Sequence, residues 1–173
     1  MIKLGKSHFL IVITVLYAIM VFYLSVSDGI DDLLQNYLEI GIGHPLKNIL
    51  LANNLSFLMN FIFASVDAAQ KMSLDPRHIG IYFGFGVLLY FVFLTSKNPT
   101  LVRYSAICAV FIGTAYGILN EIFQSFLSYR VASVADAVSN LIGVVLAQIF
   151  VILFVLALKT VLNKKKKVEA PAD

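Results

Sequence analysis

Several acidic, basic and amide side chains lie at the ends of long apolar runs, at spacings that put them on shared helix faces. Glu121 is followed three residues later by Gln124, and Asp136 is followed four residues later by Asn140. Carboxylates beside a histidine can transfer protons as general acid and base, and an arginine can hold a phosphate or carboxylate. The candidate catalytic residues are Glu121, Asp136 and His78, and the candidate substrate-binding residues are Arg130, Gln124, Asn140 and Tyr82.

Two other roles fit the same polar residues. They could form a structural network in which Arg130 neutralises carboxylates where helix ends meet, since structural ion pairs imitate active sites. They could also line a cavity that binds a membrane lipid without any chemistry. A His, Glu and Asp set could also hold a divalent metal, but the chain has no His-Glu-x-x-His spacing, so no metal site is expected, and no cofactor is expected either.

The composition indicates a membrane-embedded chain. Of its 173 residues 60% are hydrophobic and 13% are charged, and the mean hydropathy is +0.88, which excludes an ordinary water-soluble globular domain. A spanning helix takes about 20 residues, so about four or five spans fit. The basic run Lys164 to Lys167 is typical of a topology signal, and nucleic-acid binding is not expected. The single cysteine, Cys108, lies in an apolar run and provides neither an intrachain disulfide nor a zinc site.

Four apolar runs are long enough to cross the hydrocarbon core of a bilayer. They predict helices over about 9–27, 79–95, 101–124 and 136–160. The first run could also be a cleaved secretory signal, but its apolar part exceeds the roughly 7–15 residues usual for one, so we expect an uncleaved helix. Residues 1–163 then form one transmembrane domain, followed by a basic cytoplasmic tail over 164–173.

Charge decides whether the more polar run from Ile49 to Val66, inside the segment 28–77, is a fifth span. With four spans and a cytoplasmic N-terminus, nine basic residues lie inside and four outside. If the run crossed, five would lie inside and eight outside, against the positive-inside rule. We therefore predict an all-α integral membrane protein: a bundle of four transmembrane helices, with an extra interfacial or re-entrant helical segment in the first outer loop. Both termini are then cytoplasmic, and the candidate site residues meet at the outer end of the bundle.

Small residues and one buried amide predict how the helices pack. Gln148, in the middle of the fourth predicted helix, is expected to hydrogen-bond to Thr114 or Asn120. Glycines four residues apart bring helices close, within one bundle by default and between copies of a homo-oligomer as the alternative. These glycine pairs are Gly80 with Gly84 and Gly113 with Gly117.

The polar motifs resemble those of the VanZ-like membrane proteins. The longest match covers the third and fourth predicted helices and resembles the family signature Asp-Glu-x-x-Gln...Arg...Asp-x-x-x-Asn-x-x-Gly. It consists of Asn120, Glu121, Gln124, Arg130, Asp136, Asn140 and Gly143. Two shorter matches are His78-x-x-x-Tyr82, which resembles the second motif of the family, and Tyr23-Leu24-Ser25, which resembles the end of its first helix.

The resemblance covers residues 15–27 and 75–150 and has two departures. Asn120 stands where many members carry aspartate, and Asp75-Pro76-Arg77 stands where an Asp-Lys pair is usual. The resemblance implies a VanZ-like protein at the outer face of the cytoplasmic membrane, in cell-envelope modification or teicoplanin-type glycopeptide resistance. Whether it is an enzyme stays open. Its expected partner is a membrane lipid or a lipid-linked envelope component, and the alternative is a small membrane scaffold whose polar residues are purely structural.

Overall fold

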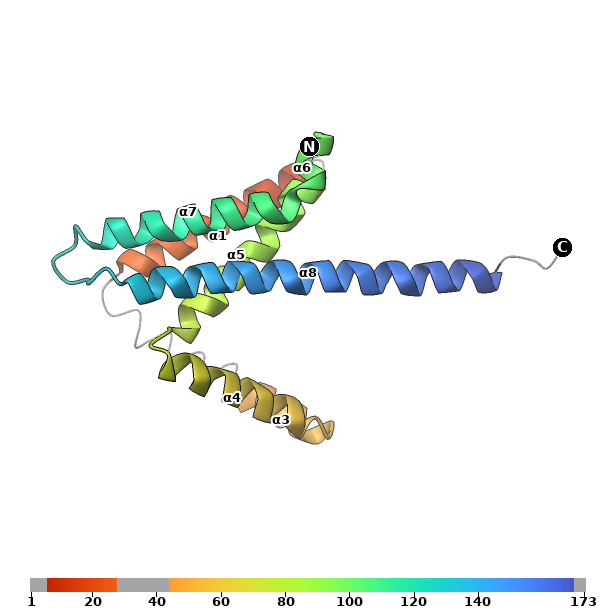
Figure 1. Ribbon diagram of the computed structural model, residues 1–173, viewed down its shortest axis with the longest axis horizontal. Helices are drawn as coiled ribbons and strands as arrows, with labels where there is room; N and C mark the ends of the chain where they lie inside the picture. The colour runs from red at the N-terminus through yellow and green to blue at the C-terminus, as the bar shows by residue number, and fades with distance from the viewer. Residues whose placement is uncertain (1–5, 28–43, 170–173) are drawn as a thin grey trace, which may run out of the picture.

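Helices account for nearly all of the chain that the structure describes. The computed structural model describes residues 6–27 and 44–169, and this part contains seven helices and no strand (Figure 1). They are α1 (Lys6–Val26), α3 (His44–Ala52), α4 (Ser56–Lys71), α5 (Pro76–Leu94), α6 (Pro99–Arg103), α7 (Ser105–Gln124) and α8 (Val134–Glu169). Four of them, α1, α5, α7 and α8, are long and apolar enough to cross a membrane. The prediction of an all-helical fold with four such helices is confirmed.

The helix bounds differ from the predicted ones at three places. The predicted helix 101–124 is divided into α6 and α7, which meet at Tyr104. The backbone of α8 stays helical to Glu169, through residues that were predicted as a separate tail. The predicted outer segment 28–77 contains α3 and α4 from His44 onward, and its first part, 28–43, lies outside the described residues.

The four long helices run alternately in opposite directions, so one end of the bundle collects two helix ends and two helix starts. In Figure 1 the ends of α1 and α7 and the starts of α5 and α8 all lie at the left. Helix α5 contacts α1, α7 and α8, and α7 also packs on α8. The candidate site residues lie at the start of α5, the end of α7, the start of α8 and the connection between α7 and α8, so the order of the helices already brings them into one region.

Helices α5 and α8 approach each other until their backbones touch. A Cβ atom on Gly143 would overlap the carbonyl oxygen of Ile79, and a Cβ on Gly86 would lie 2.8 Å from that of Ala147. Small residues permit this approach because no side chain separates the two helix backbones. The contact fixes the start of α5 beside the first turns of α8.

The predicted glycine pairs pack to different extents. Gly113 lies against Val144, and Gly117 also lies against a residue of α8, so this pair brings α7 onto α8 as predicted. Gly84 lies against a tyrosine of α1. Gly80 differs, because a Cβ added there would meet nothing within 4 Å. The Gly80 half of the first predicted pair therefore makes no close contact between helices.

Polar side chains in the middle of the bundle bond to backbone carbonyl groups. The Tyr17 hydroxyl donates to the carbonyl oxygen of Ile81 at 2.9 Å, and the Tyr116 hydroxyl donates to a carbonyl of α1 at 2.6 Å. Gln148 Nε2 donates to the carbonyl oxygen of Gly86 at 3.1 Å, in α5 and not in α7 as predicted. Each of these donors has a partner in apolar surroundings, where an unpaired polar group is costly.

Helices α3 and α4 form an apolar hairpin that the bundle does not cover. Asn54, with a φ of 56°, lies in the turn that divides them, and asparagine tolerates such a backbone better than most residues. Neither helix has a buried residue, and large side chains such as Phe57 and Phe61 are exposed. Helix α4 contacts α5, and the hairpin lies below the long helices in Figure 1. The run 49–66 is therefore two short helices, and neither is among the four candidate spans.

We expect Gly143→Ala to destabilise the bundle. The added methyl group would meet the backbone of Ile79, which cannot move without separating α5 from α8, and such overpacking costs about 1–3 kcal/mol. Gly80→Ala is the matched control, because its methyl group meets nothing and alanine favours a helix over glycine by about 1 kcal/mol. Thermal melting in detergent should place Gly143→Ala below the wild type and Gly80→Ala at or above it. Equal melting of the two variants would contradict the backbone contact.

Candidate functional site

A cavity of about 240 Å³ lies where α1 and α7 end and α5 and α8 begin. Side chains from all four long helices and from the connection between α7 and α8 line it. The residue Asn140, predicted as part of the site, is 1% exposed and contacts a histidine of the lining. The other predicted site residues all line the cavity: His78, Tyr82, Glu121, Gln124, Arg130 and Asp136. The structure thus brings the predicted residues together, and their chemical roles stay predictions.

One serine links the end of α7 to the start of α8. The Ser133 hydroxyl accepts a hydrogen bond from the Asp136 N–H at 3.3 Å, as a residue that caps a helix does. The Ser133 N–H donates to Glu121 Oε2 at 3.1 Å. Asp136 lies in the first turn of α8, where the helix dipole favours a negative charge. One short turn therefore holds Glu121 and Asp136 in the same region.

Asp75 caps the start of α5. Its carboxylate accepts from the Arg77 N–H at 2.8 Å, and Pro76 occupies the first turn, where its missing N–H needs no partner. The Arg77 guanidinium donates to both oxygens of the Asp75 carboxylate, with a shortest distance of 2.7 Å. Burial alone would raise the pKa of Asp75, but the hydrogen bonds and charge of Arg77 bring the pKa below its ordinary value of 3.8. Asp75 is therefore ionised at neutral pH.

Two hydrogen bonds tie the start of α5 to α8. The Asp75 N–H donates to Ser139 Oγ at 3.0 Å, and His78 Nδ1 lies 2.9 Å from Asn140 Oδ1. An amide oxygen can only accept, so Nδ1 is the donor of this pair, and in the neutral ring Nε2 then has the lone pair. One nitrogen of His78 is therefore fixed by the protein, and the other can bind a ligand or a proton.

Two of the predicted binding residues also hold the end of α1. Gln124 Nε2 donates to the carbonyl oxygen of Ser25 at 3.1 Å and to its hydroxyl at 2.8 Å. Arg130 donates to the carbonyl oxygen of Ser27. Carbonyl groups at a helix end have no partner within the helix, so these side chains satisfy them. The amide nitrogen of Gln124 is thus already hydrogen-bonded to α1, and these bonds hold α1 against α7.

Glu121 carries one of the buried polar atoms of the site that lack a close partner. The residue is 6% exposed, and its Oε2 accepts the hydrogen bond from Ser133. Its Oε1 is buried and has no partner at hydrogen-bond distance among the residues that the structure describes. The Asn140 side chain interacts with this carboxylate, and its Nδ2 is in the same state. A small movement would therefore let the two groups satisfy each other, and a ligand in the cavity could also satisfy them.

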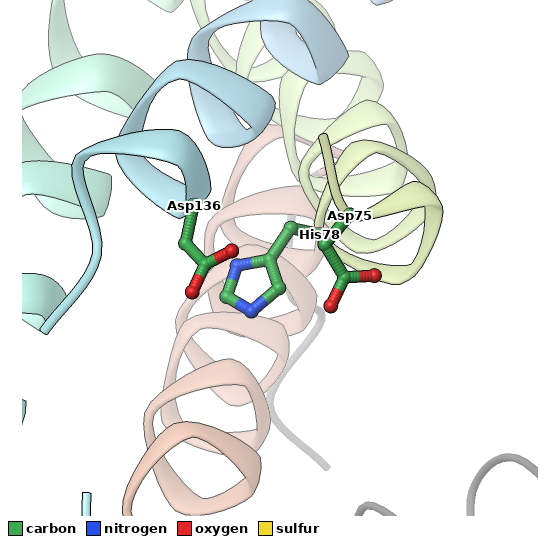
Figure 2. A group of neighbouring side chains, drawn as sticks. All are labelled: Asp75, His78 and Asp136. Atoms are coloured by element: carbon green, nitrogen blue, oxygen red, sulfur yellow. The ribbon is translucent and has the colours of Figure 1, made fainter. Parts of the chain in front are cut away.

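Three residues of the cavity could hold a metal ion. Asp75, His78 and Asp136 each offer one ligand atom, and these atoms lie within 4.8 Å of one another (Figure 2). Sequence reasoning missed Asp75, Arg77 and Asn120 as lining residues of the site. The signal for the first was its position three residues before His78, a spacing that puts both on one face of a helix. The sequence predicted only that Asp136 and His78 lie at the same end of the bundle, and their close approach depends on how α8 packs on α5.

The site combines three carboxylates, a histidine and two arginines around one small cavity. The guanidinium groups can bind an anion, and the carboxylates and the imidazole can bind a cation or move a proton. No family model, no curated protein and no solved structure matches this chain.

We expect Gln124→Met to destabilise the protein, because the variant removes the donor to Ser25 and leaves two half-buried acceptors of α1 unpaired. The expected loss is about 1–3 kcal/mol in the free energy of unfolding. Gln70→Met is the matched control, since Gln70 is exposed on α4. Chemical denaturation in detergent measures both variants. A Gln124→Met protein as stable as the control would show that this amide serves a ligand and not the packing of α1.

Proposed function

We propose that this chain is a VanZ-like multi-pass protein of the cytoplasmic membrane, with both termini in the cytoplasm and the cavity at the outer face. The four long apolar helices and the placement of the basic residues support this orientation. The cavity end carries three acidic residues, whereas Lys97 and Arg103 lie at the opposite end, around α6. Basic residues favour the cytoplasmic side. The α3–α4 hairpin is then the interfacial or re-entrant segment of the outer half.

The proposed ligand is the phosphate or carboxylate of a membrane lipid or a lipid-linked envelope component. The observation that carries this proposal is that Arg77 and Arg130 line one cavity, since guanidinium groups bind such anions through paired hydrogen bonds. The starts of α5 and α8 lie at the same end, and helix starts also favour negative charge. The cavity of about 240 Å³ is smaller than the roughly 300–1,000 Å³ of pockets that enclose drug-sized ligands. It suits a head group better than a whole antibiotic.

Chemistry on that ligand would use Glu121, Asp136 and His78. His78 Nε2 can take or give a proton, because Nδ1 is held by Asn140. Glu121 is buried beside the cavity with one oxygen unpaired by hydrogen bonds in the described chain, which suits a proton acceptor. Binding without reaction would need the arginines but not these proton carriers.

In the cell, we propose that this site modifies the envelope and raises tolerance to teicoplanin-type glycopeptides. The resemblance of the polar motifs to the VanZ-like proteins supports this proposal. A glycopeptide is larger than the cavity, so the antibiotic itself is not the proposed ligand. Tolerance to the antibiotic would instead measure the change that the protein makes in the envelope.

A small membrane scaffold is the second candidate function, and one observation favours it. Many polar side chains at the cavity are bonded to other parts of the chain, as Gln124 is to Ser25 and His78 is to Asn140. Such bonds hold helices together whether or not a ligand enters. A purely structural cluster predicts that loss of one buried charged group unfolds the protein. A working site predicts a folded protein that lacks activity.

Labelling of single cysteines tests the orientation. In a Cys108→Ser background, Ser128→Cys should react with a membrane-impermeant maleimide on intact protoplasts, because the exposed Ser128 lies between α7 and α8 at the cavity end. Lys97→Cys, exposed at the opposite end, should react only after permeabilisation. The reverse pattern would place the cavity in the cytoplasm and overturn the proposed orientation.

Teicoplanin susceptibility tests the function. Cells that express the wild type should tolerate more teicoplanin than cells with the empty vector, and Glu121→Gln should return tolerance to the vector level. The substitution keeps the size of the side chain and removes its charge, so the site loses a proton carrier with little change of shape. Membrane levels of both proteins are measured by immunoblot and matched.

Asp67→Asn is the control for this experiment. It also neutralises a carboxylate, but Asp67 is exposed on α4, and its ion pair with Lys71 is solvent-exposed and contributes little to stability. This variant should keep the wild-type tolerance. Absence of any tolerance from well-expressed wild type would contradict the proposed function. Loss of Glu121→Gln protein from the membrane would instead favour the scaffold.

A further inference from the structure

We propose that the cavity binds a divalent transition-metal ion, with Zn²⁺ preferred, through Asp75, His78 and Asp136. One ligand atom of each residue lies within 4.8 Å of the other two. Figure 2 shows the His78 ring between the two carboxylates, with His78 and Asp75 at the start of α5 and Asp136 at the start of α8. Two ligand atoms on one Zn²⁺ ion are about 3.4 Å apart, since Zn–N and Zn–O bonds are about 2.0–2.2 Å long. A metal ion would have to draw the three ligand atoms together to close this difference, and Asp75 would give up part of its pairing with Arg77.

Two of the three ligands are already oriented by a neighbour, as metal ligands usually are. Asn140 Oδ1 accepts the hydrogen of His78 Nδ1, and in the neutral ring Nε2 then has the lone pair that binds a metal. Arg77 donates to both oxygens of Asp75, and each oxygen accepts two hydrogen bonds, so a metal ion would replace one of them. Asp136 lies in the capped first turn of α8, which fixes the position of its backbone. The three side chains therefore lie in one place before a metal arrives, and the metal would draw their ligand atoms together.

Glu121 places a further carboxylate beside the three ligands. Its side chain lines the same cavity, is 6% exposed and carries a buried Oε1 with no partner at hydrogen-bond distance in the described part of the chain. Ser133 already holds Oε2, so Oε1 is the oxygen that remains to be satisfied. The Asn140 side chain is a donor beside this carboxylate, and a cation in the cavity would stabilise the carboxylate in the same way. Glu121 does not belong to the 4.8 Å group, so it adds negative charge next to the metal and is not one of its ligands.

The charges around the cavity agree with a dication. Three carboxylates line the cavity, and the guanidinium of Arg77 is bonded to the carboxylate of Asp75. Arg130 is bonded to the end of α1, at Ser27. A dication bound at Asp136 would also offset the nearby charge of Glu121, in surroundings where an uncompensated charge is costly.

The ligand types select the metal. Imidazole suits Zn²⁺, whereas Mg²⁺ and Ca²⁺ prefer sites made of oxygen alone. Zinc sites that also bind a substrate combine protein ligands with an open position, and the cavity provides one. The sequence expectation of no metal rested on the lack of a His-Glu-x-x-His spacing. That spacing describes ligands on one helix, and here they come from the start of α5 and the start of α8.

In the cell, the role of the metal rests on the proposed function. An open coordination position would take a phosphate or carboxylate oxygen of the lipid-linked ligand and add a positive charge to that of the arginines. Metal binding itself is measured on the purified protein without lipid or antibiotic. The metal site and the proposed function can therefore fail separately.

The experiment uses the full chain in detergent, purified with a tag that contains no histidine and stripped with a chelator. Calorimetric titration and elemental analysis after dialysis should give one Zn²⁺ per chain, with no competition from Mg²⁺ or Ca²⁺. Asp136→Asn and His78→Gln should each weaken Zn²⁺ binding by at least about 100-fold, since loss of an outer partner alone costs roughly 10–100-fold. Co²⁺ should give the visible absorption of a four- or five-coordinate site, and both variants should lose it.

Asp67→Asn and His44→Gln are the matched controls, because both residues are exposed on the α3–α4 hairpin. Both controls should bind Zn²⁺ as the wild type does. Equal loss of affinity in controls and ligand variants, or no saturable binding to the wild type, would overturn the proposal. If the ligand variants do not fold, the wild type decides: Zn²⁺ must raise its Tm, and an unchanged Tm overturns the site.

Discussion

The backbone contact between Gly143 of α8 and Ile79 of α5 sets the register of the two helices that build most of the site. Glycine has no side chain, so the helices approach until a carbonyl group of one meets the Cα of the other. His78 precedes Ile79, and Asn140 lies about one turn before Gly143. The same contact therefore brings the His78 imidazole within hydrogen-bond distance of the Asn140 side-chain amide. Helix α7 joins this pair through its own two glycines.

Apolar surroundings make a polar group costly unless it has a partner, and this constraint explains where the polar side chains lie. In the middle of the bundle, Tyr17, Tyr116 and Gln148 bond to backbone carbonyl groups of neighbouring helices. At the cavity end, Asp75 and Ser133 satisfy N–H groups that the first turns of α5 and α8 leave over. The residues that cap the helices therefore lie at the same end of the bundle as the cavity. The position of a residue at this end does not show whether it serves stability or ligand binding.

Sequence reasoning identified six of the polar residues that line the cavity, because polar side chains at the ends of apolar runs are costly and few. It did not identify Ser25 of α1 as the hydrogen-bond partner of the Gln124 amide nitrogen. Spacing along a helix shows that Gln124 shares a face with Glu121, but it does not show that this face also meets α1. Asp75 and Arg77 were noted only as a departure from a motif, and the structure makes them the cap of α5 and its ion pair.

The sequence by itself determined the helical class, the four long apolar helices, their approximate bounds and the end of the bundle where polar residues gather. These features depend on the length and periodicity of apolar runs and on the alternating direction of successive helices, which are local properties. Only the tertiary structure decided that Asp136 meets His78 and that Gly113 packs whereas Gly80 does not. Such contacts depend on the rotation and register of one helix against another. Those are set by side-chain packing between distant segments, which no spacing within a single helix records.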